Sequence, residues 1–114
     1  MKKTIFLSAI AMTLLACNPS NPLLEAPETP YGVPAFDQVK IEHYMPAFEA
    51  AIAEQKAEID AIVNNPEVPT FENTIVALDY AGDMLGRVTT VFFNLNSAET
   101  SDEIQALAQQ LSPS

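Results

Sequence analysis

The side chains of this 114-residue sequence that could take part in chemistry are a single histidine, a single cysteine and two closely spaced aspartates. His43, in Glu42-His43-Tyr44, could ligate a metal ion. A catalytic zinc site takes three protein ligands, however, and the sequence has no second histidine. No serine can be placed beside His43 from the sequence, so a serine nucleophile has no assignable base. We therefore expect His43 to pack against other side chains or to cap a helix.

Asp79 and Asp83 lie one helical turn apart, a spacing that paired carboxylates could use in general acid–base catalysis. Asp83 also stands four residues before Arg87, and this is the spacing of an ordinary ion pair on a helix. The second interpretation is favoured, with both aspartates on a solvated polar edge. The sequence therefore assigns no catalytic and no metal-binding residue within this chain.

The charge balance restricts the partners of the chain. Acidic side chains number 15 against five basic ones, for a net charge of −10. Without Lys2 and Lys3, the remaining three cations leave a balance of −12. Nucleic acid is excluded as a partner because phosphate binding requires clustered Lys and Arg. One cysteine excludes a disulfide framework, and three glycines nearly exclude a glycine-rich phosphate loop.

The first 17 residues are typical of a bacterial lipoprotein signal. Met1-Lys2-Lys3 is followed by 13 mostly apolar residues, too few to span a bilayer core that takes about 20. The segment ends Leu14-Leu15-Ala16-Cys17, which resembles a lipobox. That resemblance implies lipid attachment to Cys17 and a membrane anchor on the periplasmic side of the outer membrane of a bacterial envelope. The alternative is an ordinary signal peptide with a chance cysteine.

Residues 18–37 are expected to form a tether, because five of the nine prolines fall there. Its second half carries Tyr31 and Phe36, which we expect to dock on the body. The first half is then the free linker.

Residues 38–114 are predicted to be helical, since apolar side chains recur every three or four residues and no β-type alternation is present. The first helix is expected over about 46–63, with 41–44 as a separate turn. The second follows Thr70 and runs to about Leu95, and the third begins near Thr100 as a capping box with Glu103. The fold class is therefore all-α, with antiparallel helices.

The second helix is the most informative element, because it is apolar nearly all round. Such a helix is buried within a larger body. Gly82 falls in its middle, where glycine costs about 1 kcal/mol relative to alanine. We expect another backbone to approach closely at this glycine.

Five short segments together resemble the N-terminus of the peptidyl-dipeptidases, or dipeptidyl carboxypeptidases, of the thimet oligopeptidase family of zinc metallopeptidases. They are Asn21-Pro22-Leu23-Leu24, Pro34-Ala35-Phe36-Asp37, His43-Tyr44-Met45-Pro46-Ala47-Phe48-Glu49, the run 69–78 from Pro69 to Leu78, and the run 92–98 from Phe92 to Ala98. The resemblance covers nearly all of the chain after Cys17. It corresponds to only the leading part of such an enzyme.

The resemblance implies a helical protein with a deep channel that admits short peptides and releases dipeptides from their C-termini. It also implies a zinc ion held by His-Glu-x-x-His and a downstream Glu. None of these residues is present here, so zinc and peptide substrates belong to a full-length parent whose C-terminal remainder is the expected partner. Whether this chain alone is an enzyme stays open. The alternative function is a complete small acidic helical lipoprotein that acts as a binding module.

Overall fold

The computed structural model describes residues 21–112 of the chain. Its helices are α1 (Ile41–Val63), α2 (Ala77–Tyr80), α3 (Asp83–Ala98) and α4 (Asp102–Leu111), with the short 3₁₀ turn η1 (Pro30–Gly32) and the π-helical segment η2 (Phe71–Val76). No strand occurs among the described residues, and the predicted all-α class is confirmed. The predicted signal segment and Cys17 lie outside the described residues.

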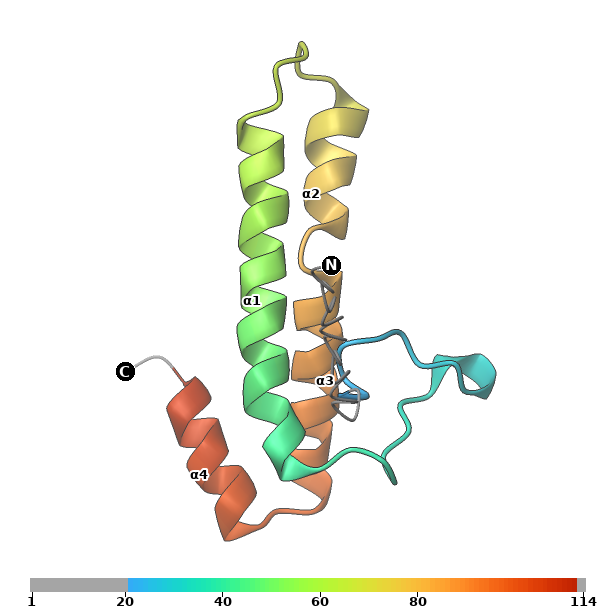
Figure 1. Cartoon of the computed structure of the whole chain (residues 1–114), viewed down its shortest axis with the longest axis vertical. Helices are drawn as coiled ribbons and strands as arrows, with labels where there is room; N and C mark the ends of the chain where they lie inside the picture. Colours follow the sequence, from blue (N-terminus) through green and yellow to red (C-terminus); the bar gives the residue numbers. More distant parts are fainter. Residues whose placement is uncertain (1–20, 113–114) are drawn as a thin grey trace, which may run out of the picture.

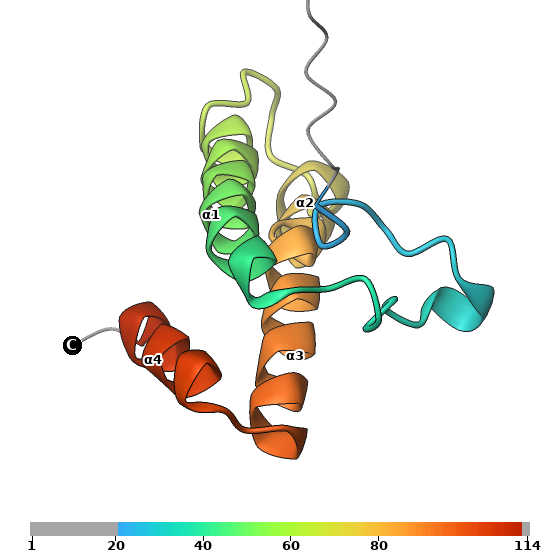
Figure 2. The same cartoon turned by 60° about the horizontal axis from the view of Figure 1, so that its bottom comes forward.

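Three helical runs are arranged up, down and up (Figure 1). The long helix α1 lies beside α2 and α3, which follow one another along its length in the opposite direction. The last helix, α4, returns beside the first turns of α1 and diverges from α3 at an angle (Figure 2). The hairpin formed by the second half of α1 with η2 and α2 therefore projects beyond the place where the other helices meet.

The start of α1 corrects the prediction, since the helix begins at Ile41 rather than near Pro46. Residues 41–44 are its first turn, and Pro46 lies inside the helix. A proline there removes only one backbone hydrogen bond, the one to the carbonyl of Glu42. The rest of α1 packs on α3, and this packing outweighs the loss of one hydrogen bond.

The predicted second helix is divided into two at Ala81 and Gly82, which is the main correction to the helix predictions. Ala81 has extended backbone angles (φ −64°, ψ 126°), and Gly82 adopts a left-handed conformation with φ 85°. Glycine accepts this conformation without the penalty paid by other residues. The close approach expected at Gly82 does occur, but it comes from the side chain of Gln55 and not from a backbone.

The core lies where α1, α3 and α4 meet. Its buried side chains are Leu23, Tyr44, Ala47, Phe48, Val88, Val91, Phe92, Ile104 and Leu107. Phe92 is at the centre, with edge-on ring contacts to Tyr44 at 5.0 Å and Phe48 at 5.7 Å between centroids. Edge-to-face geometry is the favoured arrangement for such rings. α4 joins this core after Ser101 caps its first turn by accepting a hydrogen bond from Ile104 N–H at 3.2 Å.

The segment before α1 docks through its first half, contrary to the expectation for Tyr31 and Phe36. Leu23 is only 4% exposed and belongs to the core, whereas Tyr31 is fully exposed and Phe36 half-exposed. Asn21 holds the turn in place, since its side chain accepts from Leu23 N–H at 3.0 Å and donates to the carbonyl of His43 at 2.7 Å. The proline-rich stretch is therefore attached at its beginning and loops away afterwards.

Candidate functional site

His43 acts in the structure as a helix cap. It is the third residue of α1, and its Nδ1 accepts a hydrogen bond from the backbone N–H of Lys40 at 3.1 Å. This contact satisfies a donor that would otherwise lack a partner at the helix start. The expectation that His43 would pack or cap is thus confirmed in its capping form.

The structure places Asp79 and Asp83 on either side of a break between two helices. Asp79 is on α2 and Asp83 on α3, so the break at Gly82 separates them, and both residues are exposed. Asp83 lies 3.7 Å from Arg87 in an ion pair one turn along α3. This pair matches the ordinary helix interaction predicted for it.

Within residues 21–112, no three His, Cys, Asp or Glu side chains come together as ligands for a metal ion. The described residues thus do not fit the zinc site that the sequence resemblance implies for a full-length parent. None of the helices in this part of the chain has the length and apolar character needed to cross a membrane.

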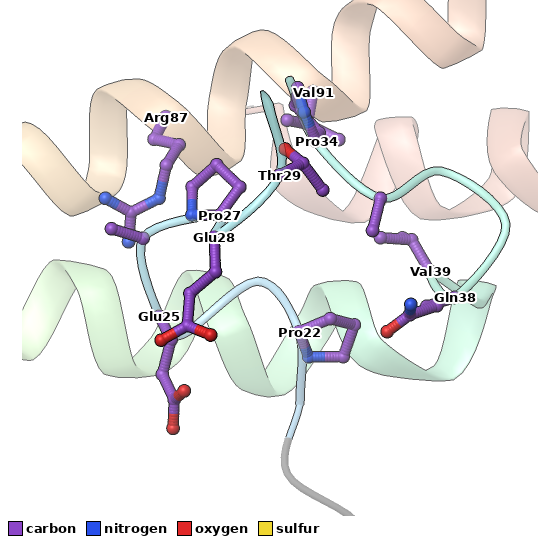
Figure 3. A pocket seen from close by; sticks show the side chains of 12 residues that line it. Pro22, Glu25, Pro27, Glu28, Thr29, Pro34, Gln38, Val39, Arg87 and Val91 are labelled. Carbon is purple, nitrogen blue, oxygen red and sulfur yellow. The ribbon is translucent and has the colours of Figure 1, made fainter. Parts of the chain in front are cut away.

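A cavity of about 370 Å³ lies beneath the segment before α1, between that segment and α3 (Figure 3). Prolines, Thr29 and Val39 of the segment line one side, and Arg87 and Val91 of α3 line the other. Figure 3 shows the carboxylates of Glu25 and Glu28 pointing away from the Arg87 guanidinium. The Thr29 hydroxyl already donates to the carbonyl of Val33. The lining therefore combines the Arg87 cation and two carboxylates with prolines and other apolar side chains.

A more pronounced surface feature is a row of large apolar side chains on η2 and α2. Phe71, Ile75 and Leu78, which we call the outer stripe, are 65%, 52% and 54% exposed. They border a shallow groove together with Val76, Asp79 and Tyr80. The sequence predicted an apolar helix buried in a larger body. In this chain the outer stripe in its first half is open to solvent, whereas Val88, Val91 and Phe92 in its second half are buried.

The chain is similar to several curated peptidases. It is 46% identical over 93 residues to dipeptidyl carboxypeptidase from Salmonella typhimurium and 48% identical over 92 residues to dipeptidyl carboxypeptidase from Escherichia coli. Oligopeptidase A from Haemophilus influenzae is 35% identical over 94 residues. No model of a protein family matches the chain.

These matches include 81–82% of this chain but only 13–14% of each relative. The chain thus spans about one seventh of the length of the dipeptidyl carboxypeptidases that it matches. The resemblance seen in the sequence is confirmed: the chain is homologous to the N-terminal part of dipeptidyl carboxypeptidases.

Proposed function

We propose that this chain is the N-terminal portion of a membrane-tethered zinc metallopeptidase that removes C-terminal dipeptides from oligopeptides. The observation that carries the proposal is the 46–48% identity to two dipeptidyl carboxypeptidases, of which the chain spans only 14%. Identity at this level, extended over four fifths of the chain, favours the same role for the matched segment.

In this proposal the described helices are scaffold. The zinc ligands, a His-Glu-x-x-His motif and a further Glu, would lie in a remainder of the polypeptide, because this chain has a single histidine. Zinc would supply an activated water for peptide hydrolysis. The part played by residues 21–112 is to build a helical wall near the peptide channel.

The proposed location is the bacterial cell envelope, anchored by lipid on Cys17 at the periplasmic side of the outer membrane. Several acyl chains hold a protein on a membrane, whereas one chain binds only marginally. Mass spectrometry of the mature protein should find acyl groups on Cys17, and Cys17→Ser should release the protein into the soluble fraction. An unmodified Cys17 in the mature protein would contradict the anchor without affecting the peptidase proposal.

The test of the activity begins with the reading frame beyond Ser114, which should continue into His-Glu-x-x-His. The complete product should release dipeptides from short peptides with a free C-terminus, as followed by chromatography and mass spectrometry. Matched peptides with a C-terminal amide should be spared. A chelator should stop the release, and added zinc should restore it. A frame that stops at Ser114, or cleavage without dipeptide release, would overturn the proposal, and the first result would favour a small binding lipoprotein.

A further inference from the structure

The helical segment 71–80 turns three of its large apolar side chains to a surface that α1 does not cover. Toward α1 this segment and the next residue present Asn73, Ala77, Tyr80 and Ala81, which share a groove with Ala61 and Ile62 of α1. Its large apolar side chains, the outer stripe of Phe71, Ile75 and Leu78, lie on the groove-lining surface. A helix in a soluble protein normally turns its large apolar side chains toward its partner.

No residue of η2 or α2 is buried, although this segment carries several large apolar side chains. By contrast, α3 buries Val88, Val91 and Phe92 against α1. Between Phe48 and Val88 the only buried residue is the small Ala51 of α1. The projecting hairpin therefore has too little apolar contact of its own to account for its composition.

The outer stripe is nevertheless held in a defined shape. Thr70 Oγ1 accepts from Asn73 N–H at 3.1 Å, and Asn73 Oδ1 accepts in return from Thr70 N–H at 2.7 Å. The Asn73 amide also donates to the carbonyl of Val68 at 3.0 Å. These reciprocal bonds fix the start of the helix, and at its other end Glu58 holds the Gly82 N–H. A surface fixed in advance loses little conformational freedom when it is covered.

We propose that the outer stripe is the surface on which the remainder of the longer polypeptide docks, through an apolar patch of its own. This inference rests on the proposed function. The match spans 14% of the dipeptidyl carboxypeptidases, so in a parent of that length the remainder would be about six times the size of the matched segment. Phe71, Ile75 and Leu78 have the spacing i, i+4 and i+7. Side chains with this spacing form a row on a helix against which another helix can pack.

Charge argues against two other occupants. A second copy would bring together two bodies that each carry −12 after Lys2 and Lys3 are excluded, and they repel one another. An anionic membrane surface is disfavoured for the same reason, because Glu72 and Asp79 stand beside the stripe and no cation lies in η2 or α2. The remainder of the same polypeptide is the occupant that the observations favour.

Cysteine labelling tests the docking in the complete product. Ile75→Cys is placed in a background whose other cysteines are serine, and Val33→Cys serves as the matched control because Val33 is 51% exposed and Ile75 52%. In the 114-residue chain at low concentration, both cysteines should react with a maleimide at similar rates. In the complete product Ile75→Cys should react at least about tenfold more slowly, since a covered thiol reacts only while its site opens. The rate at Val33→Cys should stay within about twofold.

The outcomes separate the two proposals. A complete product that releases dipeptides but labels Ile75→Cys as fast as the short chain would overturn the docking and leave the proposed function intact. Equal slowing at both positions would also contradict a specific docking surface. Protection of Ile75→Cys that grows with the concentration of the short chain would identify a second copy as the occupant. A frame that ends at Ser114 would remove both proposals.

Discussion

The side-chain amide of Gln55 lies directly over the α-carbon of Gly82, at the point where the chain changes direction between α2 and α3. A Cβ atom at position 82 would come within 2.4 Å of Gln55 Nε2 and 2.8 Å of its Cδ. The backbone of Gly82 is also left-handed, with φ 85°. Position 82 therefore favours glycine for its left-handed backbone, and a Cβ atom there would also have to displace the flexible amide of Gln55.

Gly82→Ala should lower the unfolding free energy of residues 18–114 by about 1–2 kcal/mol, because a side chain in the left-handed region is disfavoured by that amount. Crowding against Gln55 adds to this loss of unfolding free energy only if the flexible side-chain amide of Gln55 cannot move away. Urea unfolding followed by far-ultraviolet circular dichroism measures the change. In a double-mutant cycle, Gln55→Ala should recover the steric part and leave the conformational part. Full recovery would show that the backbone strain is unimportant.

The contact between Glu58 and the start of α3 gives a second prediction. Gly82 N–H donates to Glu58 Oε2 at 2.8 Å, so a carboxylate from α1 caps the positive end of α3. Glu58→Ala should lower the unfolding free energy by about 1 kcal/mol, as the loss of a helix cap does. Glu58→Gln keeps an acceptor oxygen and should lose less. Glu54→Ala, one turn earlier on the exposed side of α1, is the control, and an equal effect there would exclude a capping role.

The sequence predicted much of the fold because apolar periodicity reports which side chains face a core. Phe48, Val88 and Phe92 follow the three-and-four spacing of apolar side chains in the sequence, and all three are buried. The break at Gly82 was missed because the three-and-four spacing continues across it, so periodicity alone carries no sign of a change in direction. The available signal was the single glycine itself, between Ala81 and Asp83.

The docking of Leu23 and the exposure of the outer stripe could not be predicted for a different reason. Proline content indicates an extended segment but does not say which of its side chains is buried. Likewise, the apolar character of the helix after Thr70 was evident, but the sequence does not contain the surface against which it would pack. The cap formed by His43 was foreseen as one of two structural roles, because a lone imidazole has few other uses.

Tyr44 gives a prediction for alkaline pH. The residue is fully buried beside Phe92, and its hydroxyl has no hydrogen-bond partner among the described residues. Burial raises the pKa of Tyr44 above the ordinary value of 10.0. The unfolded chain therefore releases this proton more readily, and the stability present below pH 10 should fall as the pH rises above it.

In Tyr44→Phe, the unfolding free energy should fall less steeply as the pH rises above 10. The same variant should raise the unfolding free energy at neutral pH by about 1 kcal/mol, because an unpartnered buried hydroxyl is removed. Urea unfolding of residues 18–114 over a series of pH values measures both effects. Tyr80→Phe, at a tyrosine that is 71% exposed, should change neither. Destabilisation by Tyr44→Phe would mean that the hydroxyl has a partner in solution.

Residues 18–114 by themselves should hydrolyse no peptide and retain no zinc. A catalytic zinc site uses three protein ligands and a water, and His43 is committed to the Lys40 N–H. Incubation with short peptides should leave them intact by mass spectrometry, and dialysed protein should contain far less than one zinc per chain by elemental analysis. Stoichiometric zinc together with chelator-sensitive cleavage would contradict this prediction.

The outer stripe leads to the last prediction, which concerns residues 18–114 without any further polypeptide. Phe71, Ile75 and Leu78 are each more than half exposed, and fully covering such a side chain contributes about 1.5–3 kcal/mol. For a domain with a net stability of about 5–15 kcal/mol, that missing contribution is large. The chain should therefore be helical but bind dyes that recognise exposed apolar surface, or self-associate despite its charge.

Sizing chromatography, dye fluorescence and near-ultraviolet circular dichroism test this behaviour. The triple variant Phe71→Ser, Ile75→Ser and Leu78→Ser should lose most of the dye signal and elute as a monomer, because it removes the apolar side chains without touching the core around Phe92. The matched control changes three other exposed apolar side chains, Val33, Phe36 and Val63, to serine and should keep the signal. A parent fragment that elutes as a compact monomer and binds no dye would mean that the stripe is stable in water. The requirement for a covering partner would then disappear, and a self-sufficient binding module would explain the chain better than a segment of a peptidase.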